Sequence, residues 1–339
     1  MKIDLRSDTI TQPSQAMKMA MFAAPLGDDV FGDDPSVIEL EELAAEMFGK
    51  EAGLYCASGT MTNQIAIKVH TNAPGEVICD ELSHVYKYEG GGIGFNSGLA
   101  THLLQGNRGR LTATQIEAAI QIDDIHFPET QLVSLENTCN KGGGSIYELA
   151  ALQEIQSLCQ THNLPLHLDG ARVFNALIAS DYTALDMGNV FDSISVCLSK
   201  GLGAPVGSVL LGSATFIKRA RRIRKLFGGG MRQAGIIAKG GTYALQHNIE
   251  RLMEDHARAK ALAEALEACS YVNGLLPVDT NIVVFEVDSN VGYLNTLEKL
   301  KQQGVWAAPF GANQIRLVTH LDFDDAKLEQ TNAILKNLY

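Results

Sequence analysis

The spacing of apolar residues predicts that helices and strands alternate along most of the first two thirds of the chain. Ser36 and Glu39 form an S-x-x-E capping box before apolar residues at helical spacing, so they predict the start of a helix. Thr112 and Gln115 form a similar T-x-x-Q box and predict the start of another. The helices expected in this part of the chain cover 36–49, 62–70, 112–120 and 147–162.

Short apolar runs between these helices are typical of buried strands, because strands covered on both faces lose the alternation of apolar and polar residues. The runs are 53–57, 77–79, 132–135, 166–168, 194–198 and 208–211. Strands that alternate with helices predict an α/β fold, in which a mainly parallel sheet is covered by helices.

A long helical pattern at about 234–268 separates this region from the rest of the chain. The patterns beyond it suggest a small β-α-β-α unit, formed by 282–287, 293–303, 314–318 and 325–338. We therefore expect a large domain with an N-terminal arm over residues 1–245 and a smaller α+β domain over residues 246–339.

The composition of the 339 residues is that of a globular protein, with 46% hydrophobic and 19% charged residues. Lys and Arg total 27 against 39 Asp and Glu, which gives a net charge of −12. Binding to phosphate backbones depends on clustered Lys and Arg, so nucleic acid is not expected as a partner. Nowhere do 18 consecutive apolar residues occur, so we expect no membrane span.

The six cysteines form no CxxC pair and no dense framework, which favours reduced thiols over disulfides or a zinc site. The N-terminus also lacks an apolar signal region. We expect a cytoplasmic protein without a bound metal.

Two strand ends carry residues with reactive side chains. Asp169 ends one buried strand, and ligands of open α/β sheets bind at the carboxyl ends of strands. The alternative is an ordinary helix N-cap. Lys200 follows the next strand among small residues, where burial lowers the pKa of an amine and prepares it to form a Schiff base. The alternative is a surface lysine on a turn.

A third element, Ser58-Gly59-Thr60, stands between a strand and a helix, where free backbone N–H groups and the helix dipole favour a phosphate. By itself, this segment is also typical of an ordinary turn. No nucleotide-binding glycine motif accompanies it. A phosphate cradle, the Asp169 carboxylate and the Lys200 amine together fit one cofactor, pyridoxal 5′-phosphate.

The chain resembles the low-specificity L-threonine aldolases, a family of pyridoxal-phosphate enzymes of fold type I (aspartate-aminotransferase-like). Seven segments carry the resemblance: DLRSDT at 4–9, GDDVFGDDP at 27–35, SLENT at 134–138, HLDGAR at 167–172, LSKGLGAPVGS at 198–208, GGGMRQ at 228–233 and RLVTH at 316–320. The resemblance covers nearly the whole chain and implies reversible cleavage of a β-hydroxy-α-amino acid, such as L-threonine or L-allo-threonine, to glycine and an aldehyde.

The resemblance also implies a role for each matching residue. Lys200 holds the cofactor covalently, Asp169 pairs with its ring nitrogen, and His84 stacks on its ring. The further residues that bind the cofactor are Ser58, Gly59, Thr60 and Arg172. Those that bind the substrate carboxylate are Ser7, Arg172 and Arg316. In a homotetramer with shared sites, a neighbouring subunit's phosphate is reached by Lys225 and Arg232.

Cleavage of the bond between Cα and Cβ needs a proton acceptor near the β-hydroxyl, and His84 and His126 are the candidates. Cys139 departs from the family, which commonly has a histidine after Glu-Asn-Thr. An aminotransferase or a racemase of the same fold type shares Lys200 and Asp169 and is the nearest alternative. A non-catalytic cofactor-binding or scaffolding protein is expected to lack the lysine.

Overall fold

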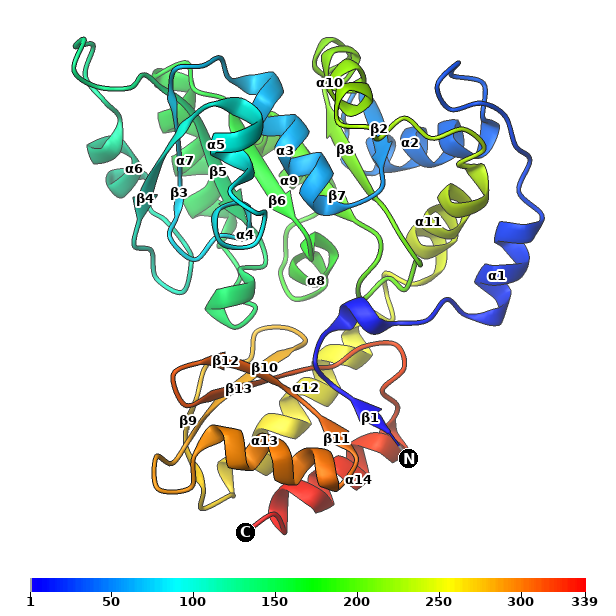
Figure 1. Cartoon of the computed structure of the whole chain (residues 1–339), viewed down its shortest axis with the longest axis vertical. Coiled ribbons are helices and arrows are strands. Elements are labelled where there is room, and N and C mark those ends of the chain that lie inside the picture. The colour runs from blue at the N-terminus through cyan, green and yellow to red at the C-terminus, as the bar shows by residue number, and fades with distance from the viewer. Residues whose placement is uncertain (1) are drawn as a thin grey trace.

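The computed structural model describes residues 2–339 and centres on a seven-stranded sheet (Figure 1). The strand order is β2-β8-β7-β6-β5-β3-β4. In this sheet β8 pairs antiparallel with both neighbours, and the other pairs are parallel. The strands are β2 (Ala52–Cys56), β3 (Glu76–Asp80), β4 (Ala100–Leu104), β5 (Thr130–Glu136), β6 (Leu166–Gly170), β7 (Ser193–Cys197) and β8 (Ser208–Gly212).

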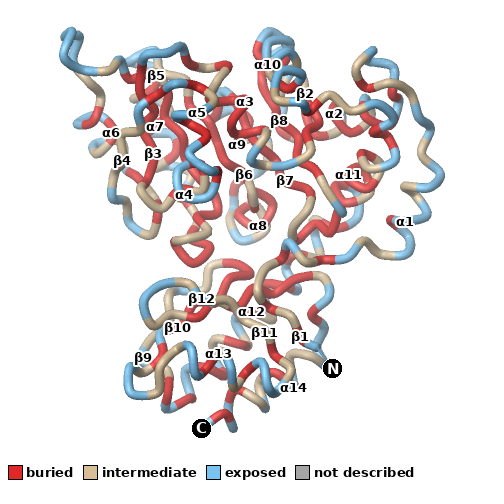
Figure 2. The backbone as a smooth tube through the Cα atoms, in the orientation of Figure 1, coloured by how far each residue is buried: buried red, intermediate tan, exposed pale blue. Residues whose placement is uncertain are grey.

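Helices cover both faces of this sheet, and the strands between them are mostly buried (Figure 2). The largest apolar core joins one face to α2 (Pro35–Met47), α7 (Leu149–Thr161) and α11 (Gly235–His247). Smaller cores join the other face to α3 (Gly59–His70) and α10 (Ala214–Leu226). The remaining helices around the sheet are α1 (Gln15–Phe22), α4 (His84–Lys87), α5 (Gly92–Ser97), α6 (Ala113–Ala119), α8 (Val173–Ile178) and α9 (Ala184–Val190).

A second, four-stranded antiparallel sheet forms a smaller unit with its own apolar core. Its strand order is β12-β13-β10-β9, from β9 (Val272–Leu275), β10 (Ile282–Val287), β12 (Ala308–Gly311) and β13 (Gln314–Val318). Its helices are α12 (Leu252–Glu267), α13 (Tyr293–Gln302) and α14 (Asp325–Lys336).

The N-terminal strand β1 (Ile3–Asp4) joins the smaller unit, because it pairs in parallel with β11 (Val305–Trp306). Ile3 and Leu5 are buried in the core of that unit, and Figure 1 shows β1 beside β11. The N-terminal arm therefore connects the two ends of the chain. The domain division between residues 245 and 246 stays a prediction.

Two local expectations were wrong in detail. Helix α2 is capped by Asp34, whose Oδ1 accepts from the backbone N–H groups of Ser36 and Val37, so the Ser36–Glu39 box is not its start. The helical pattern at 234–268 is two helices, α11 and α12, because the chain turns at 248–251. The box at Thr112 and Gln115 is confirmed as the start of α6. Among residues 2–339, no helix is both long enough and apolar enough to cross a bilayer.

Candidate active site

The carboxyl ends of the parallel strands bring several predicted residues to one cavity of about 320 Å³. His84 follows β3, Glu136 ends β5, and Lys200 follows β7. Five residues of the predicted site, from both units of the fold, line this cavity: Ser7, His84, Arg172, Lys200 and Arg316. The sequence-based grouping of these five residues therefore agrees with their positions in the structure.

Asp169 lies buried near the end of β6, and both of its carboxylate oxygens accept hydrogen bonds. Oδ1 accepts from the backbone N–H of Ala171 at 3.1 Å, and Oδ2 accepts from Nδ2 of Asn63 at 2.9 Å. One ring nitrogen of His84 and one carboxylate oxygen each of Glu89 and Asp169 lie within 4.8 Å of one another. The imidazole and the carboxylate are therefore close enough to face the same small ligand.

His84 is held from two sides. Its backbone N–H donates to Oε2 of Glu136 at 2.8 Å, and Nδ1 lies 3.0 Å from Oε1 of Glu89. Burial lowers the pKa of His84, but the hydrogen bond to Glu89 and the charge of Asp169 outweigh this, so the pKa lies above its ordinary value. The Glu89 carboxylate is already engaged by Asn63 and Gln64, so this group fits a polar network better than a metal site.

Glu136 is a residue that the sequence analysis did not single out for chemistry. Burial and the nearby Asp169 charge raise the pKa of Glu136 to about 7, although the backbone N–H groups of Asn140 and His84 bind its two oxygens. A carboxyl group with such a pKa exchanges a proton near neutrality. Its place at the end of a buried strand, like that of Asp169, is the signal that could have revealed it.

Arg172 is paired in the structure with Asp8, which the sequence analysis also missed as a site residue. Nε of Arg172 donates to Oδ2 of Asp8 at 2.8 Å, and Nη2 donates to Oδ1 at 2.7 Å. Both side chains are buried. Burial raises the pKa of Asp8, but Arg172 outweighs it and holds the pKa well below its usual range. The guanidinium fork of Arg172 is therefore already occupied by a carboxylate.

Arg316 is the second guanidinium of the cavity, and one of its nitrogens is without a partner among residues 2–339. Its Nη1 donates to Oδ1 of Asn140 at 2.9 Å and its Nη2 to the carbonyl of Arg6 at 2.8 Å. Its buried Nε has no hydrogen-bond partner among residues 2–339. Burial and the nearby Arg172 charge lower the pKa of Arg316 to about 10. An anionic ligand is the natural partner for such a group.

The predicted phosphate cradle is the start of α3. Ser58 is its N-cap and accepts from the backbone N–H of Met61 at 3.2 Å, so Gly59 and Thr60 stand in the first turn, where N–H groups have no partner within the helix. The Oγ of Ser208 is buried and unpaired among residues 2–339, and it lies 3.5 Å from where a Cβ on Gly59 would stand. The backbone N–H groups of this first turn and the Ser208 hydroxyl are therefore the donors without partners among residues 2–339 at this end of α3.

Lys200 completes the set. No hydrogen bond or ion pair within residues 2–339 involves its Nζ, while its carbonyl accepts from Oγ1 of Thr11 at 2.9 Å. The free amine, the buried Asp169 and the unpaired Ser208 are the groups that pyridoxal 5′-phosphate uses: an amine for its aldehyde, a carboxylate for its ring nitrogen and donors for its phosphate. The residues present fit this cofactor.

Three predicted site residues lie elsewhere in the chain. His126 stands in the loop before β5, its side chain is 78% exposed, and it pairs with Asp124 at 2.7 Å. The cavity lies beyond the other end of β5, about 20 Å away for a strand that rises roughly 3.3 Å per residue. Neither Lys225, near the end of α10, nor Arg232, paired with Asp28 at 2.9 Å, lines the cavity.

Cys139, the departure from the family pattern, is buried beside the site. Its thiol donates to the carbonyl of Glu136 at 2.9 Å and lies 3.4 Å from that of Gly109. Burial raises the pKa of Cys139 well above its ordinary value. The thiol therefore holds the loop after β5 and does not point into the cavity as a nucleophile.

The sequence of this chain is similar to those of known enzymes over nearly its whole length. The chain is 42% identical over 333 residues to a low-specificity L-threonine aldolase of Escherichia coli, which covers 98% of this chain and 97% of that protein. It is 38% identical over 344 residues to a probable low-specificity L-threonine aldolase of Arabidopsis thaliana, which covers 99% and 97%.

A solved structure of a threonine aldolase from Leishmania major matches with a TM-score of 0.86 over 99% of both chains, at 22% identity. At this identity the match concerns the fold, and it confirms the expected fold type I of the pyridoxal-phosphate enzymes. The sequence pattern of the beta-eliminating lyase family matches residues 4–290 of this chain. The family resemblance seen in the sequence is therefore confirmed, and the chain belongs to the beta-eliminating lyase family.

Proposed function

We propose that this enzyme is a pyridoxal-phosphate-dependent aldolase that cleaves L-threonine and L-allo-threonine reversibly to glycine and acetaldehyde. The observation that carries the proposal is the meeting of Lys200, His84 and Arg316 in one cavity beside Asp169. The relatives from Escherichia coli and Arabidopsis thaliana are named for this activity, and their similarity to this chain extends over nearly their whole length.

Pyridoxal 5′-phosphate, held by Lys200 and Asp169, would supply the electron sink that cleavage of the bond between Cα and Cβ requires. Asp169 supports this because a buried carboxylate that already accepts two hydrogen bonds favours a protonated ring nitrogen beside it. Ser208 and the first turn of α3 bind the phosphate through N–H and O–H donors. Lys200 supplies the amine that holds the cofactor.

The substrate carboxylate is bound by Arg316, whose Nε has no hydrogen-bond partner among residues 2–339. Asp8 occupies the fork of Arg172, so Arg172 supports the site by holding Asp8 and by adding positive charge behind Arg316. Ser7 lines the same wall of the cavity. This arrangement orients the amino acid with its carboxylate towards the smaller unit and its amino group towards Lys200.

His84 is the residue of this chain best placed to accept the β-hydroxyl proton, because it lines the cavity and is fixed by Glu89 and Glu136. His126 cannot touch the cavity of its own chain, so a role for it at the β-hydroxyl depends on a neighbouring subunit. The proposed homotetramer with shared sites also gives Lys225 and Arg232 a neighbour's phosphate to bind. Exposed apolar residues beside them, Phe31 and Leu226, support such an interface.

The six cysteines are free and buried, which supports a place in the reducing cytoplasm. The proposal is tested by product analysis. Purified protein with pyridoxal 5′-phosphate and L-threonine or L-allo-threonine is expected to release equal amounts of acetaldehyde and glycine. Transfer of the amino group to a keto acid without acetaldehyde release would instead identify an aminotransferase.

A further inference from the structure

The face of the sheet beneath α3 carries polar side chains where apolar ones are usual. On β6 these are His167 and Asp169, and on the adjacent β7 they are Ser193 and Ser195, in register opposite them. All four are buried. A buried polar group without a partner destabilises a fold, so the partners of these groups are informative.

Four side chains form a continuous chain of hydrogen bonds that ends at Asp169, and we call them the relay: His70, Ser193, His167 and Asn63. Nε2 of His70 lies 2.8 Å from Oγ of Ser193, which lies 2.8 Å from Nδ1 of His167. Nε2 of His167 lies 3.2 Å from Oδ1 of Asn63, and Nδ2 of Asn63 lies 2.9 Å from Oδ2 of Asp169.

The direction of each bond follows from the groups that can only donate or only accept. The amide nitrogen of Asn63 faces two carboxylates, Asp169 and Glu89, at 2.9 Å each, so both of its hydrogens are committed and its oxygen faces His167. An amide oxygen only accepts, so Nε2 of His167 carries a hydrogen.

The outer half of the relay is fixed in the same way. Burial lowers the pKa of His167 to about 3, so the ring is neutral and its Nδ1 accepts the hydrogen of Ser193. The oxygen of Ser193 then accepts from Nε2 of His70, whose pKa burial lowers to about 4. Every donor in the relay therefore points towards Asp169, and aligned hydrogen bonds of this kind strengthen one another.

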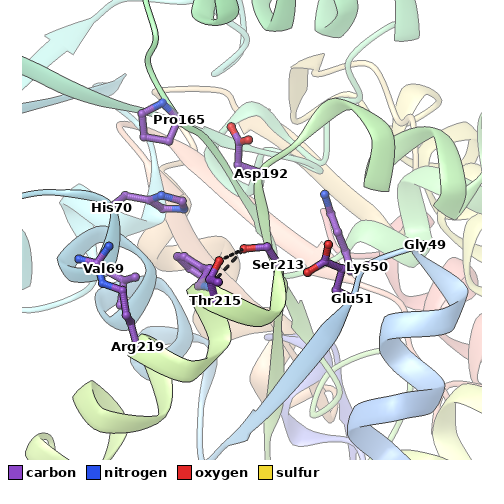
Figure 3. A pocket seen from close by; sticks show the side chains of 11 residues that line it. Gly49, Lys50, Glu51, Val69, His70, Pro165, Asp192, Ser213, Thr215 and Arg219 are labelled. Carbon is purple, nitrogen blue, oxygen red and sulfur yellow. Dashed lines mark hydrogen bonds between the residues drawn. The ribbon is translucent and has the colours of Figure 1, made fainter.

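The outer end of the relay lies at the opposite end of the sheet from the active site. His70 lines a cavity of about 550 Å³ together with Pro165 and Asp192, which directly precede β6 and β7 (Figure 3). Three of the charged groups there already have partners. Nζ of Lys50 donates to the carbonyl of Phe191, Glu51 accepts from the backbone N–H of Ala214, and Asp192 accepts from that of Leu166. The fourth, Arg219, is exposed. This cavity marks the outer end of the relay.

We propose that Asn63, His167 and Ser193 are positioning residues, which hold the Asp169 carboxylate in its ring-facing orientation through a directed chain of hydrogen bonds that begins at His70. The inference rests on the proposed function, because it gives Asp169 a ring nitrogen to bind. None of the relay residues lines the active-site cavity. His70, Ser193 and His167 reach it only through Asn63, which bonds Asp169 and also Glu89, the partner of His84. Ser193→Ala therefore leaves the contact between Asn63 and Glu89 in place and is the cleaner test.

The directions of the hydrogen bonds are tested by neutron diffraction on crystals of the deuterated full-length protein. We expect deuterium on Nε2 of both His167 and His70 and none on Nδ1 of His167. Deuterium on Nδ1 of His167 would overturn the relay, because Ser193 could not then donate to it. This readout does not depend on any activity.

The effect on Asp169 is tested by titrating pyridoxal 5′-phosphate into Ser193→Ala, with Ser195→Ala as the matched control. Both serines lie on β7 and are fully buried, but Ser195 bonds Thr62 at 2.6 Å and has no part in the relay. We expect Ser193→Ala to raise the Kd about tenfold and Asn63→Leu ten- to a hundredfold, as for lost bonds in a network that ends on a charge. Ser195→Ala is expected to stay within about twofold, and Ser193→Thr to restore most of the affinity.

The melting temperature separates positioning from simple stability. Both alanine variants lose one or two buried hydrogen bonds, so both are expected to melt at similar, lower temperatures. Equal rises in Kd for Ser193→Ala and Ser195→Ala, or no rescue by Ser193→Thr, would refute the inference. Failure of the unsubstituted protein to bind the cofactor would instead refute the proposed function.

Discussion

The buried ion pair between Asp8 and Arg172 provides a quantitative test of how the cavity is built. Asp8→Asn keeps the size of the side chain but removes the negative charge from a fork in which both partners are at least 95% buried. The substituted amide also turns one N–H group towards the guanidinium, where Asp8 had offered an oxygen. Arg172 is then left as a buried cation with no carboxylate in contact.

Removing one partner of a buried ion pair typically destabilises a protein by about 3–5 kcal/mol. The matched control is Asp4→Asn, because Asp4 binds Arg6 with the same two-bond geometry, at 2.8 and 2.6 Å, while Arg6 is 43% exposed. Exposed pairs contribute about 0–1 kcal/mol, so the control is expected to lose no more than that. Urea unfolding of both variants at one protein concentration measures the difference. Equal losses would refute the reasoning that burial makes the Asp8 pair essential.

The pH dependence of the same pair has a definite sign. Burial raises the pKa of Asp8, but Arg172 holds it well below its ordinary value of 3.8. A group whose pKa is depressed by folding contributes stability above its unfolded pKa and loses it as the pH falls through the folded value. The stability difference between the unsubstituted protein and Asp8→Asn is therefore expected to be constant above pH 5 and to shrink below pH 4. A difference that grows on acidification would contradict this assignment.

Three further predictions concern the cavity and its assembly. Burial raises the pKa of Glu136 to about 7, so the charge of this carboxylate opposes folding as the pH rises towards that value. Urea unfolding at each pH is therefore expected to show that Glu136→Gln loses less stability between pH 5 and pH 8 than the unsubstituted protein. Dilution to monomers is expected to weaken cofactor binding, and so are the substitutions Lys225→Ala and Arg232→Ala. A fully active monomer in sedimentation would contradict the shared site. His126→Ala is expected to slow acetaldehyde release from threonine more than exchange of the α-proton of glycine, and equal losses would leave His126 without a role at the β-hydroxyl.

The sequence was sufficient to locate two of the residues that stand at strand ends, although it did not single out Glu136 at the end of β5. Asp169 and Lys200 each follow a clear apolar run, and parallel strands bring their carboxyl ends to one edge whatever the details of the helices. The family segments added Ser7 and Arg316, which come from the two ends of the chain and meet in the cavity. No local pattern shows that meeting, because it depends on the N-terminal arm joining the smaller unit.

Other features depend on contacts between distant residues and could not be predicted. Asp8 and Arg172 lie 164 positions apart, and nothing near either residue shows that they pair. Strand β4 is a partly exposed edge strand without an apolar run, so it was missed. The relay had one usable signal: His167 and Asp169 occupy alternate positions on a strand that was read as uniformly apolar, which indicates a polar face beneath a helix.

The central claim is that Lys200 holds the cofactor in this cavity, and reduction with borohydride tests it most directly. The protein is loaded with pyridoxal 5′-phosphate, reduced, digested and analysed by mass spectrometry, with Lys200→Ala treated in parallel. We predict one pyridoxyl adduct, on the peptide that contains Lys200, and none in the variant. An adduct on Lys225 or on any other lysine of the unsubstituted protein, with Lys200 unmodified, would contradict the account.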